Sequence, residues 1–200
     1  MPPAPIKTVR DLMYWQYAKI ISDSAGFGKE NWGFIMKKFK DLQQGEIFWN
    51  GIREYVLEKE RKDVCIYCGS TGKLTLEHLF PHAHHGPDTE KNLVWICKSC
   101  NSIKGPRRLY EFYTLQHDLH AAKYDVPRIA EGKYLKLLYE LFKEQGKLDL
   151  NIEDMKADVC PCCDMTSLCK REHSVGKLSP LCLDGIATLA FKGTLRPIPG

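Results

Sequence analysis

Three features are absent from this 200-residue sequence, and each absence narrows what the protein can be. No apolar run reaches the roughly 18 residues that a transmembrane helix needs, so we expect no membrane span. The start, MPPAPIKTVRDL, has no basic segment followed by an apolar one, so it does not predict a secretory signal. No segment is of low complexity, which argues against wholesale disorder. We therefore expect an intracellular, cytoplasmic globular protein.

The first 64 residues also lack cysteine, whereas the rest of the chain holds nine. Because intracellular conditions keep thiols reduced, this many cysteines argues for bound metal rather than disulfides. One group lies mid-chain and the other near the end: Cys65, Cys68, Cys97 and Cys100, then Cys160, Cys162, Cys163, Cys169 and Cys182. An odd total leaves at least one thiol spare.

The cysteine-free segment has helical periodicity. Residues 8–28 place Thr8 before an apolar stripe and end in glycines, which predicts a capped helix. Residues 29–45 and 46–62 predict two further helices. We expect aromatic residues to form the core of this small bundle: Trp15, Trp32, Phe39, Trp49 and Tyr55. Farther along, Pro127 and Gly146 fit the start and end of another helix.

Two C-x2-C pairs, CIYCG and CKSCN, stand at Cys65/Cys68 and Cys97/Cys100. Each pair is a tight turn that offers two thiolates, and two such turns make a tetrahedral zinc site. With all four positions filled by protein, this zinc would be structural. Between the pairs, KLTLEHLF alternates like a strand, NLVWIC is a second extended segment, and CNSIKGPRRLYEF can begin a helix at the second pair.

The pattern CIYCG…LTLEHLFP…G…EKNLVWICKSCNSIKG resembles the zinc-stapled HNH endonucleases of the ββα-metal class over residues 65–105. The resemblance implies that Glu77, where many relatives carry Asp, and Asn101 bind a catalytic divalent metal. It implies that His78 is the general base and that Asn92 braces the loop between the strands and orients His78. Lys104 would face phosphate.

The chemistry agrees with these roles. Phosphodiester hydrolysis needs an activated water, which one imidazole can supply. It also needs neutralisation of the charge that grows on phosphorus and on the leaving oxygen, which Mg²⁺ or Mn²⁺ can supply. Glu77 and Asn101 offer hard oxygen ligands. Such ligands suit Mg²⁺ or Mn²⁺ and do not suit a second zinc site of the four-sulfur kind.

The other histidines have less definite roles. His82, His84 and His85 follow Pro81, either as exposed loop residues or as an extra metal or phosphate contact. His117 and His120 are spaced i,i+3 on a predicted helix and could share a metal, but the sequence does not identify a third ligand for them.

The modest net charge of +4 is clustered after the second cysteine pair. Four basic residues without an intervening acid form an expected phosphate-binding surface for DNA: Lys98, Lys104, Arg107 and Arg108. Such contacts position the backbone but do not read bases. RNA also remains open as a substrate.

The C-terminal cysteines partly repeat the first module, because Glu172–His173 follows Cys163 as Glu77–His78 follows Cys68. The segment EHSVGKLSPLC resembles a shortened endonuclease VII-type ββα module, although the second C-x2-C-Asn is missing. We expect a degenerate ββα zinc module with four candidate ligands: Cys160, Cys163, Cys169 and Cys182. A zinc knuckle that uses His173, a second active centre and a plain cysteine-rich tail are the alternatives.

The sequence thus predicts a small α+β protein with a ββα-metal core between helical segments. The expected regions are 1–62 (helical), 63–115 (nuclease core), 116–156 (helical) and 157–200 (second zinc module). The leading hypothesis is a metal-dependent DNA endonuclease of a bacterial or phage type. Nucleases that it resembles serve in restriction, homing, phage packaging and antiviral defence, and the sequence does not choose among these roles. A nuclease subunit of a larger complex, a homodimer formed through the helices, and a non-catalytic zinc-stapled nucleic-acid-binding module are the alternatives.

Overall fold

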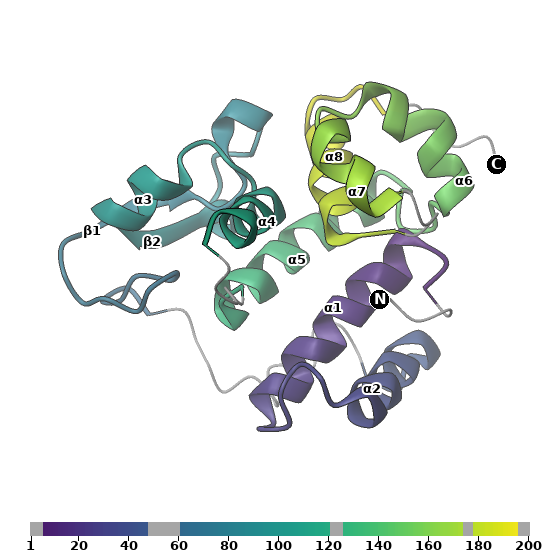
Figure 1. The fold of residues 1–200 in the computed structure, drawn as a ribbon, viewed down its shortest axis with the longest axis horizontal. Coiled ribbons are helices and arrows are strands. Elements are labelled where there is room, and N and C mark those ends of the chain that lie inside the picture. The colour runs from purple at the N-terminus through teal and green to yellow at the C-terminus, as the bar shows by residue number, and fades with distance from the viewer. Residues whose placement is uncertain (1–5, 48–60, 121–125, 174–177, 196–200) are drawn as a thin grey trace.

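The computed structural model describes residues 6–47, 61–120, 126–173 and 178–195, with the side chains of 116–120 and 170–173 outside the description (Figure 1). The helices are α1 (Val9–Ser24), α2 (Trp32–Gln44), α3 (Lys98–Lys104), α4 (Leu109–His120), α5 (Arg128–Glu144), α6 (Ile152–Asp154), α7 (Thr166–His173) and α8 (Pro180–Phe191). Strands β1 (Leu74–His78) and β2 (Leu93–Cys97) form the sheet. Short turns lie at η2 (His82–His84), η3 (Glu90–Asn92), η4 (Met155–Val159) and η5 (Cys160–Cys162). No helix within these ranges is long and apolar enough to cross a membrane.

Helices α1 and α2 confirm two of the predicted N-terminal helices. Thr8 caps α1 through a capping box with Asp11, in which each side chain binds the other residue's backbone N–H. Trp15 and Phe39 are buried between the helices. The prediction that Trp32 is a core residue is wrong, because it stacks on the outside of Trp15 and stays 53% exposed. The third predicted helix, with Trp49 and Tyr55, falls largely on residues 48–60, outside the described part.

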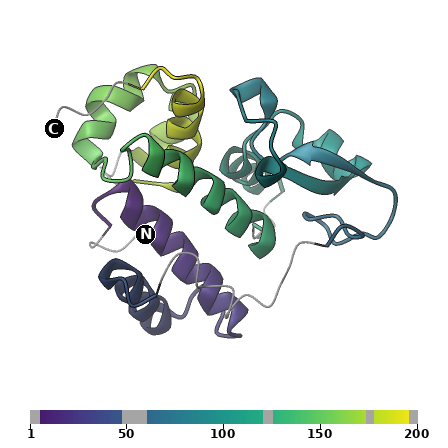
Figure 2. The ribbon, with the colours of Figure 1, turned by 180° about the vertical axis from the view of Figure 1, so that it is seen from behind.

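The central segment confirms the predicted order of strand, strand and helix. Strands β1 and β2 pair antiparallel, with Leu74 opposite Cys97 and His78 opposite Leu93. Helix α3 follows β2 directly, because the Cys97 side chain accepts a hydrogen bond from the Cys100 N–H and caps the helix. The hairpin and α3 lie at the opposite end of the molecule from α6 to α8 (Figures 1 and 2).

The C-terminal region corrects the prediction of a degenerate ββα module. Its described residues form helices and contain no strand. Helix α8 is apolar around most of its circumference and packs against α4 and α5, which favours a buried helix over a half-exposed strand. Its Asp184 is fully buried and accepts hydrogen bonds from the Tyr134 hydroxyl, at 2.6 Å, and the Glu111 N–H, at 2.8 Å.

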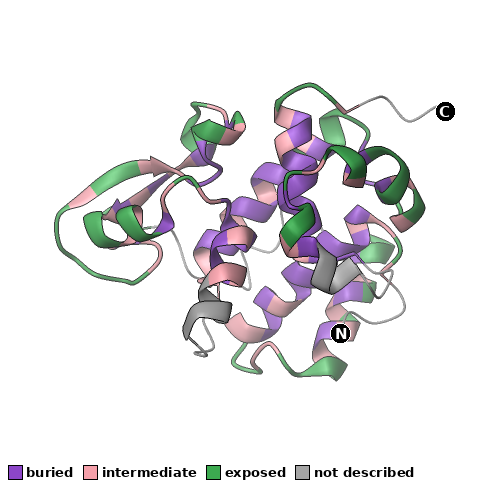
Figure 3. Cartoon of the chain, turned by 45° about the horizontal axis from the view of Figure 1, so that its top comes forward, coloured by how far each residue is buried: buried purple, intermediate pink, exposed green. Residues whose placement is uncertain are grey.

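One hydrophobic cluster runs through α1, α2, α4, α5 and α8. Burial is concentrated where these helices meet, whereas the hairpin and α3 carry many exposed residues (Figure 3). The protein is thus a small α+β fold with a two-stranded sheet and many helices. The packed helices form a support from which the hairpin and α3 project (Figure 1). The division into four regions stays a prediction.

Candidate functional site

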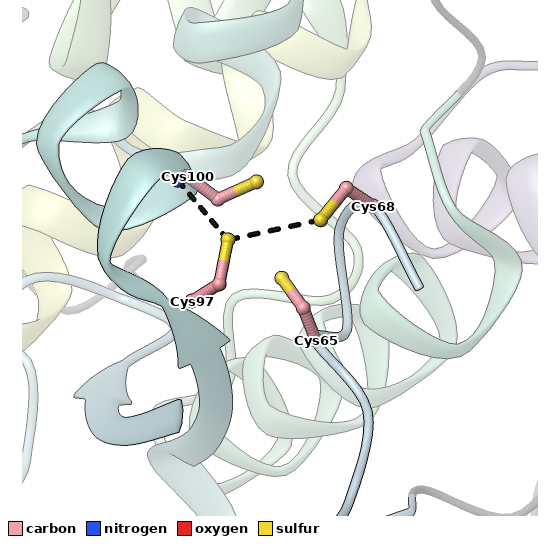
Figure 4. Close-up of side chains that lie close together, drawn as sticks. All are labelled: Cys65, Cys68, Cys97 and Cys100. Carbon is pink, nitrogen blue, oxygen red and sulfur yellow. Dashed lines mark hydrogen bonds between the residues drawn. The ribbon is translucent and has the colours of Figure 1, made fainter. Parts of the chain in front are cut away.

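The four central cysteines converge on one point (Figure 4). Their sulfur atoms all lie within 4.8 Å of one another, and the Cys68 and Cys97 sulfurs are 3.7 Å apart. The first pair sits in a tight turn, where the Gly69 N–H donates to the Cys65 carbonyl and Gly69 has φ of +72°. The Ile66 N–H donates to the Trp95 carbonyl and so fastens this turn to the edge of β2. Four converging sulfurs form a site that can hold a zinc ion.

The electrostatics of this cluster favour thiolates at its accessible corner. The hydrogen bond from the Cys100 N–H to Cys97 lowers the pKa of Cys97 to about 6. The hydroxyl of Ser70 lowers the pKa of Cys68. Burial raises the pKa of Cys100. The donor set fits zinc, which binds as sulfur ligands lose their protons.

Glu77 and Asn101 meet at a second point, on β1 and α3. The Asn101 side-chain amide donates to a Glu77 carboxylate oxygen over 3.4 Å, and both residues are half-buried. The two side chains offer hard oxygens, and neither belongs to the cysteine cluster. This donor pair fits a divalent metal that keeps several of its waters, such as Mg²⁺ or Mn²⁺.

His78 is the last residue of β1, directly after Glu77. Its Nε2 lies 3.2 Å from a carboxylate oxygen of Asp88, and its side chain is 23% exposed. From α3, the Lys104 ammonium donates to the His78 carbonyl over 3.4 Å. Burial lowers the pKa of Lys104 to about 8. Sequence reasoning missed Asp88, because a loop acid ten positions after His78 has no signal until the loop folds back.

Asn92 holds that loop together. It is fully buried, and its side-chain oxygen accepts a hydrogen bond from the Phe80 N–H at 2.7 Å. Its side-chain nitrogen donates to the carbonyls of Phe80, at 2.9 Å, and Pro87, at 2.8 Å. These bonds tie the residues after β1 to the far end of the loop. They leave the Asn92 side chain with no atom free to touch substrate.

Residues 65–107 match the family model of the HNH endonucleases. No curated protein and no solved structure matches the chain significantly. The HNH segment contains the cysteine cluster, both strands and α3, and with them Glu77, His78, Asn92 and Asn101. The chain therefore carries a segment of a nuclease family on a larger helical support.

The loop histidines of the HNH segment point in different directions. His84 is half-buried, and its Nδ1 lies 3.8 Å from a carboxylate oxygen of Asp164, outside the segment. Burial lowers the pKa of His84. The His82 ring centre is 6.0 Å from that of His78, and His85 is exposed with φ of +67°. The side chains of His117 and His120 lie outside the described residues.

The four basic residues predicted to bind phosphate divide into two pairs. Lys98 is exposed on α3, and Arg107 folds onto the end of α3, where its side chain donates to the carbonyl oxygens of Ile103 and Lys104. Lys104 and Arg108 are almost completely buried. The prediction that these two grip phosphate from the surface is wrong, because burial directs both toward protein partners.

The Arg108 side chain forms hydrogen bonds with residues from three parts of the chain. Its guanidinium donates to Glu111 at 2.9 Å, to Asp164 at 2.8 Å and to the Thr188 hydroxyl at 2.7 Å. It thereby links the end of the HNH segment to the residues before α7 and to α8. The sequence showed the charge but not these partners, which lie up to 80 positions away.

The C-terminal cysteines do not form a preformed metal site. Within the described ranges, the central four cysteines are the one group of three or more metal-ligating side chains that lie close together. Cys169 and Cys182 are buried, while Cys160 and Cys163 are half-buried. Burial raises the pKa of Cys182 to about 11 and also raises that of Cys163. The second zinc site therefore stays a prediction, and the side chains of Glu172 and His173 lie outside the description.

Proposed function

We propose that this protein is a metal-dependent endonuclease that hydrolyses phosphodiester bonds in DNA. The observation that carries the proposal is the pairing of Glu77 with Asn101 directly beside His78, inside a segment that matches a nuclease family. A module that only bound nucleic acid would need the cysteine staple but not these three side chains together.

Each residue has a defined role in this reaction. Glu77 and Asn101 would hold Mg²⁺ or Mn²⁺, which would supply Lewis-acid stabilisation of the negative charge on the phosphate and the leaving oxygen. His78 takes a proton from the attacking water. Asn92 keeps the loop closed behind His78, and the buried ammonium of Lys104 holds the backbone at His78 in place.

The substrate surface follows from the exposed charge near the site. Lys98 and the half-exposed Arg107 are the predicted phosphate contacts that remain accessible. Both lie on or beside α3, the helix that carries Asn101. A few such contacts bind a phosphate backbone without reading its sequence, so we expect activity on DNA of many sequences.

A cleavage assay on plasmid, linear and single-stranded DNA, with and without Mg²⁺ or Mn²⁺, tests the proposal. We expect His78→Ala to lower the cleavage rate by about 100-fold or more, because general bases contribute on that scale. Zinc content and circular dichroism should stay as in wild type. His85→Ala is the matched control, since His85 is exposed in the same loop and should cut normally. Undiminished cutting by His78→Ala would refute the assignment of the base.

One observation favours a second candidate, a nuclease subunit that acts within a larger assembly. At the tip of α1 and α2, Phe27 is 54% exposed and its ring lies 4.7 Å from that of Phe34. The exposed Trp32 lies at the start of the same helix as Phe34. Clustered exposed aromatics are typical of protein-binding surfaces. Sedimentation of wild type against Trp32→Ala tests for self-association, and a monomer in both cases would remove the homodimer.

A further inference from the structure

Asp88 is the one carboxylate that the described structure places in contact with the His78 ring. It lies in the loop between β1 and β2, ten residues after His78, and its side chain is 81% exposed. An exposed loop acid normally points into solvent. Here the carboxylate instead turns back toward the imidazole, and the fold of the loop explains why.

The loop is held closed from both ends. The Asn92 amide bridges the carbonyls of Phe80 and Pro87, and the Gly86 N–H donates to the Pro81 carbonyl. Gly86 packs so tightly on this turn that an added Cβ would lie 2.0 Å from the Phe80 carbonyl oxygen. Only glycine fits there, so the closed path of the loop is built into the sequence. Because Pro87 is held in place, the next residue, Asp88, lies beside the His78 ring, with its carboxylate 3.2 Å from Nε2.

The contact decides which ring nitrogen of His78 carries the hydrogen. A neutral imidazole has one N–H donor and one bare nitrogen, and an ionised carboxylate can only accept. With Asp88 against Nε2, the hydrogen belongs on Nε2 and the lone pair is left on Nδ1.

We propose that Asp88 is a positioning residue that fixes the His78 ring with its hydrogen on Nε2, so that Nδ1 is the atom that accepts the proton from water. The proposal rests on the proposed function, in which His78 is the base. The proton moves from the attacking water to Nδ1, while the Nε2–H stays donated to Asp88 throughout. Asp88 itself neither gains nor loses a proton.

In this proposal Asp88 serves the His78 ring and not the metal: its carboxylate lies 3.2 Å from Nε2 of His78. The Glu77 carboxylate accepts a hydrogen bond from Asn101 on α3, whereas Asp88 approaches His78 from the loop. The two carboxylates therefore serve different atoms, and removing Asp88 should leave metal affinity in place.

The test compares wild type with Asp88→Ala, Asp88→Asn and the control Glu90→Ala in the full zinc-loaded chain. Glu90 is exposed two residues away, so its removal changes the charge equally without touching His78. The first readout is the ¹⁵N shifts of the His78 ring nitrogens, recorded without DNA at a pH where imidazole is neutral. We expect wild type to show one fixed tautomer with hydrogen on Nε2. Asp88→Ala should move these shifts toward those of the exposed His85 ring.

The second readout is the single-turnover cleavage rate, with DNA and Mn²⁺ affinities measured alongside. Asp88→Ala should lower the rate about ten-fold or more and leave both affinities within about two-fold, because positioning acts on the chemical step. Asp88→Asn, which keeps an acceptor oxygen, should recover part of the rate. In a His78→Ala background the Asp88 change should have no further effect.

The outcomes separate this proposal from the nuclease assignment. Unchanged His78 shifts in Asp88→Ala would overturn the positioning role whatever the protein cuts. Loss of Mn²⁺ binding with unchanged shifts would overturn it in favour of a metal ligand. If wild type cuts no DNA but the His78 shifts still move, the nuclease proposal fails and the Asp88–His78 pair stands.

Discussion

Tyr67 carries a buried hydroxyl that has no hydrogen-bond partner among the described residues. Tyr67 belongs to the cysteine turn, and its ring faces α4, with ring centres 6.3 Å from Phe112 and 6.4 Å from Tyr113. Burial raises the pKa of this hydroxyl well above its usual value, so it stays neutral. An unpaired buried hydroxyl costs free energy, because it has lost water and gained nothing in return.

We therefore expect Tyr67→Phe to leave the free energy of unfolding unchanged or to raise it by about 1 kcal/mol. Tyr134→Phe is the matched control, because its equally buried hydroxyl donates to Asp184 at 2.6 Å. Losing that bond should lower the free energy of unfolding by about 1–3 kcal/mol. Urea unfolding of both variants measures the difference. A larger loss from Tyr67→Phe than from Tyr134→Phe would mean that the Tyr67 hydroxyl has a bound partner.

Single residues also mark the limit of what the sequence could predict about the site. Glu77, His78 and Asn101 could be predicted as one group because they belong to a short motif with fixed spacing, and the structure does bring Asn101 to within 3.4 Å of Glu77. Lys104 and Arg108 were misread as surface charges, because a basic run has the same appearance in sequence whether its partners are phosphates or distant carboxylates. Burial depends on the packing of other helices, and no local pattern encodes it.

At the level of elements, the cysteine cluster and α3 depend on one another. Cys97 ends β2, contributes a sulfur to the cluster and caps α3 by accepting the Cys100 N–H. Helix α3 has only seven residues, too few to be stable alone. Its position therefore depends on the cluster at its start, and Asn101 depends on α3. The cysteine cluster thus positions one of the two residues proposed to bind the catalytic metal.

Cys97→Ser should release about one zinc per chain and loosen the hairpin and α3, while the helical support stays folded. Structural zinc sites contribute on the order of 10 kcal/mol to the folding of small modules, so we expect the hairpin and α3 to lose their stable structure when the zinc is lost. Cys162→Ser is the control, because Cys162 is exposed and lies outside the cluster. Zinc measured by mass spectrometry and amide exchange of residues 65–107 report the two effects. A Cys97→Ser protein that keeps its zinc would contradict the proposal that the four central cysteines bind it.

The elements differ in how well sequence patterns predicted them. The capped α1 and the hairpin followed from Thr8, from alternation and from the cysteine turns. Helix α8 was missed, although Ser179 and Pro180 form an ordinary helix start. The spacing of the C-terminal cysteines resembles that of the first module, and this resemblance led to the prediction of a ββα module instead of a helix. An apolar run such as LCLDGIATLAF can be a strand or a buried helix, and only packing against α4 and α5 decides.

Across the whole molecule, Arg108 joins the HNH segment to the helical support. The family match ends at residue 107, and the next side chain is only 2% exposed. From the start of α4 it reaches Glu111, Asp164 and Thr188. Asp164 also lies beside His84 in the loop after β1. One buried cation thus connects the loop of the proposed active site with α4 and α8.

Removing this cation should weaken the whole fold rather than one end of it. Arg108→Ala leaves Glu111 and Asp164 without their countercharge, so we expect the free energy of unfolding to fall by about 2–4 kcal/mol. The loss should be smaller than for a fully buried ion pair, because Asp164 is half-exposed. Arg10→Ala is the matched control, since Arg10 also pairs with an aspartate, Asp149, but at the surface. That change should cost about 1 kcal/mol or less. Urea unfolding with zinc present, followed by circular dichroism and by tryptophan fluorescence, measures both. Equal losses in the two variants would mean that burial adds nothing to the Arg108 contacts, and that the HNH segment is held to its support by apolar packing alone.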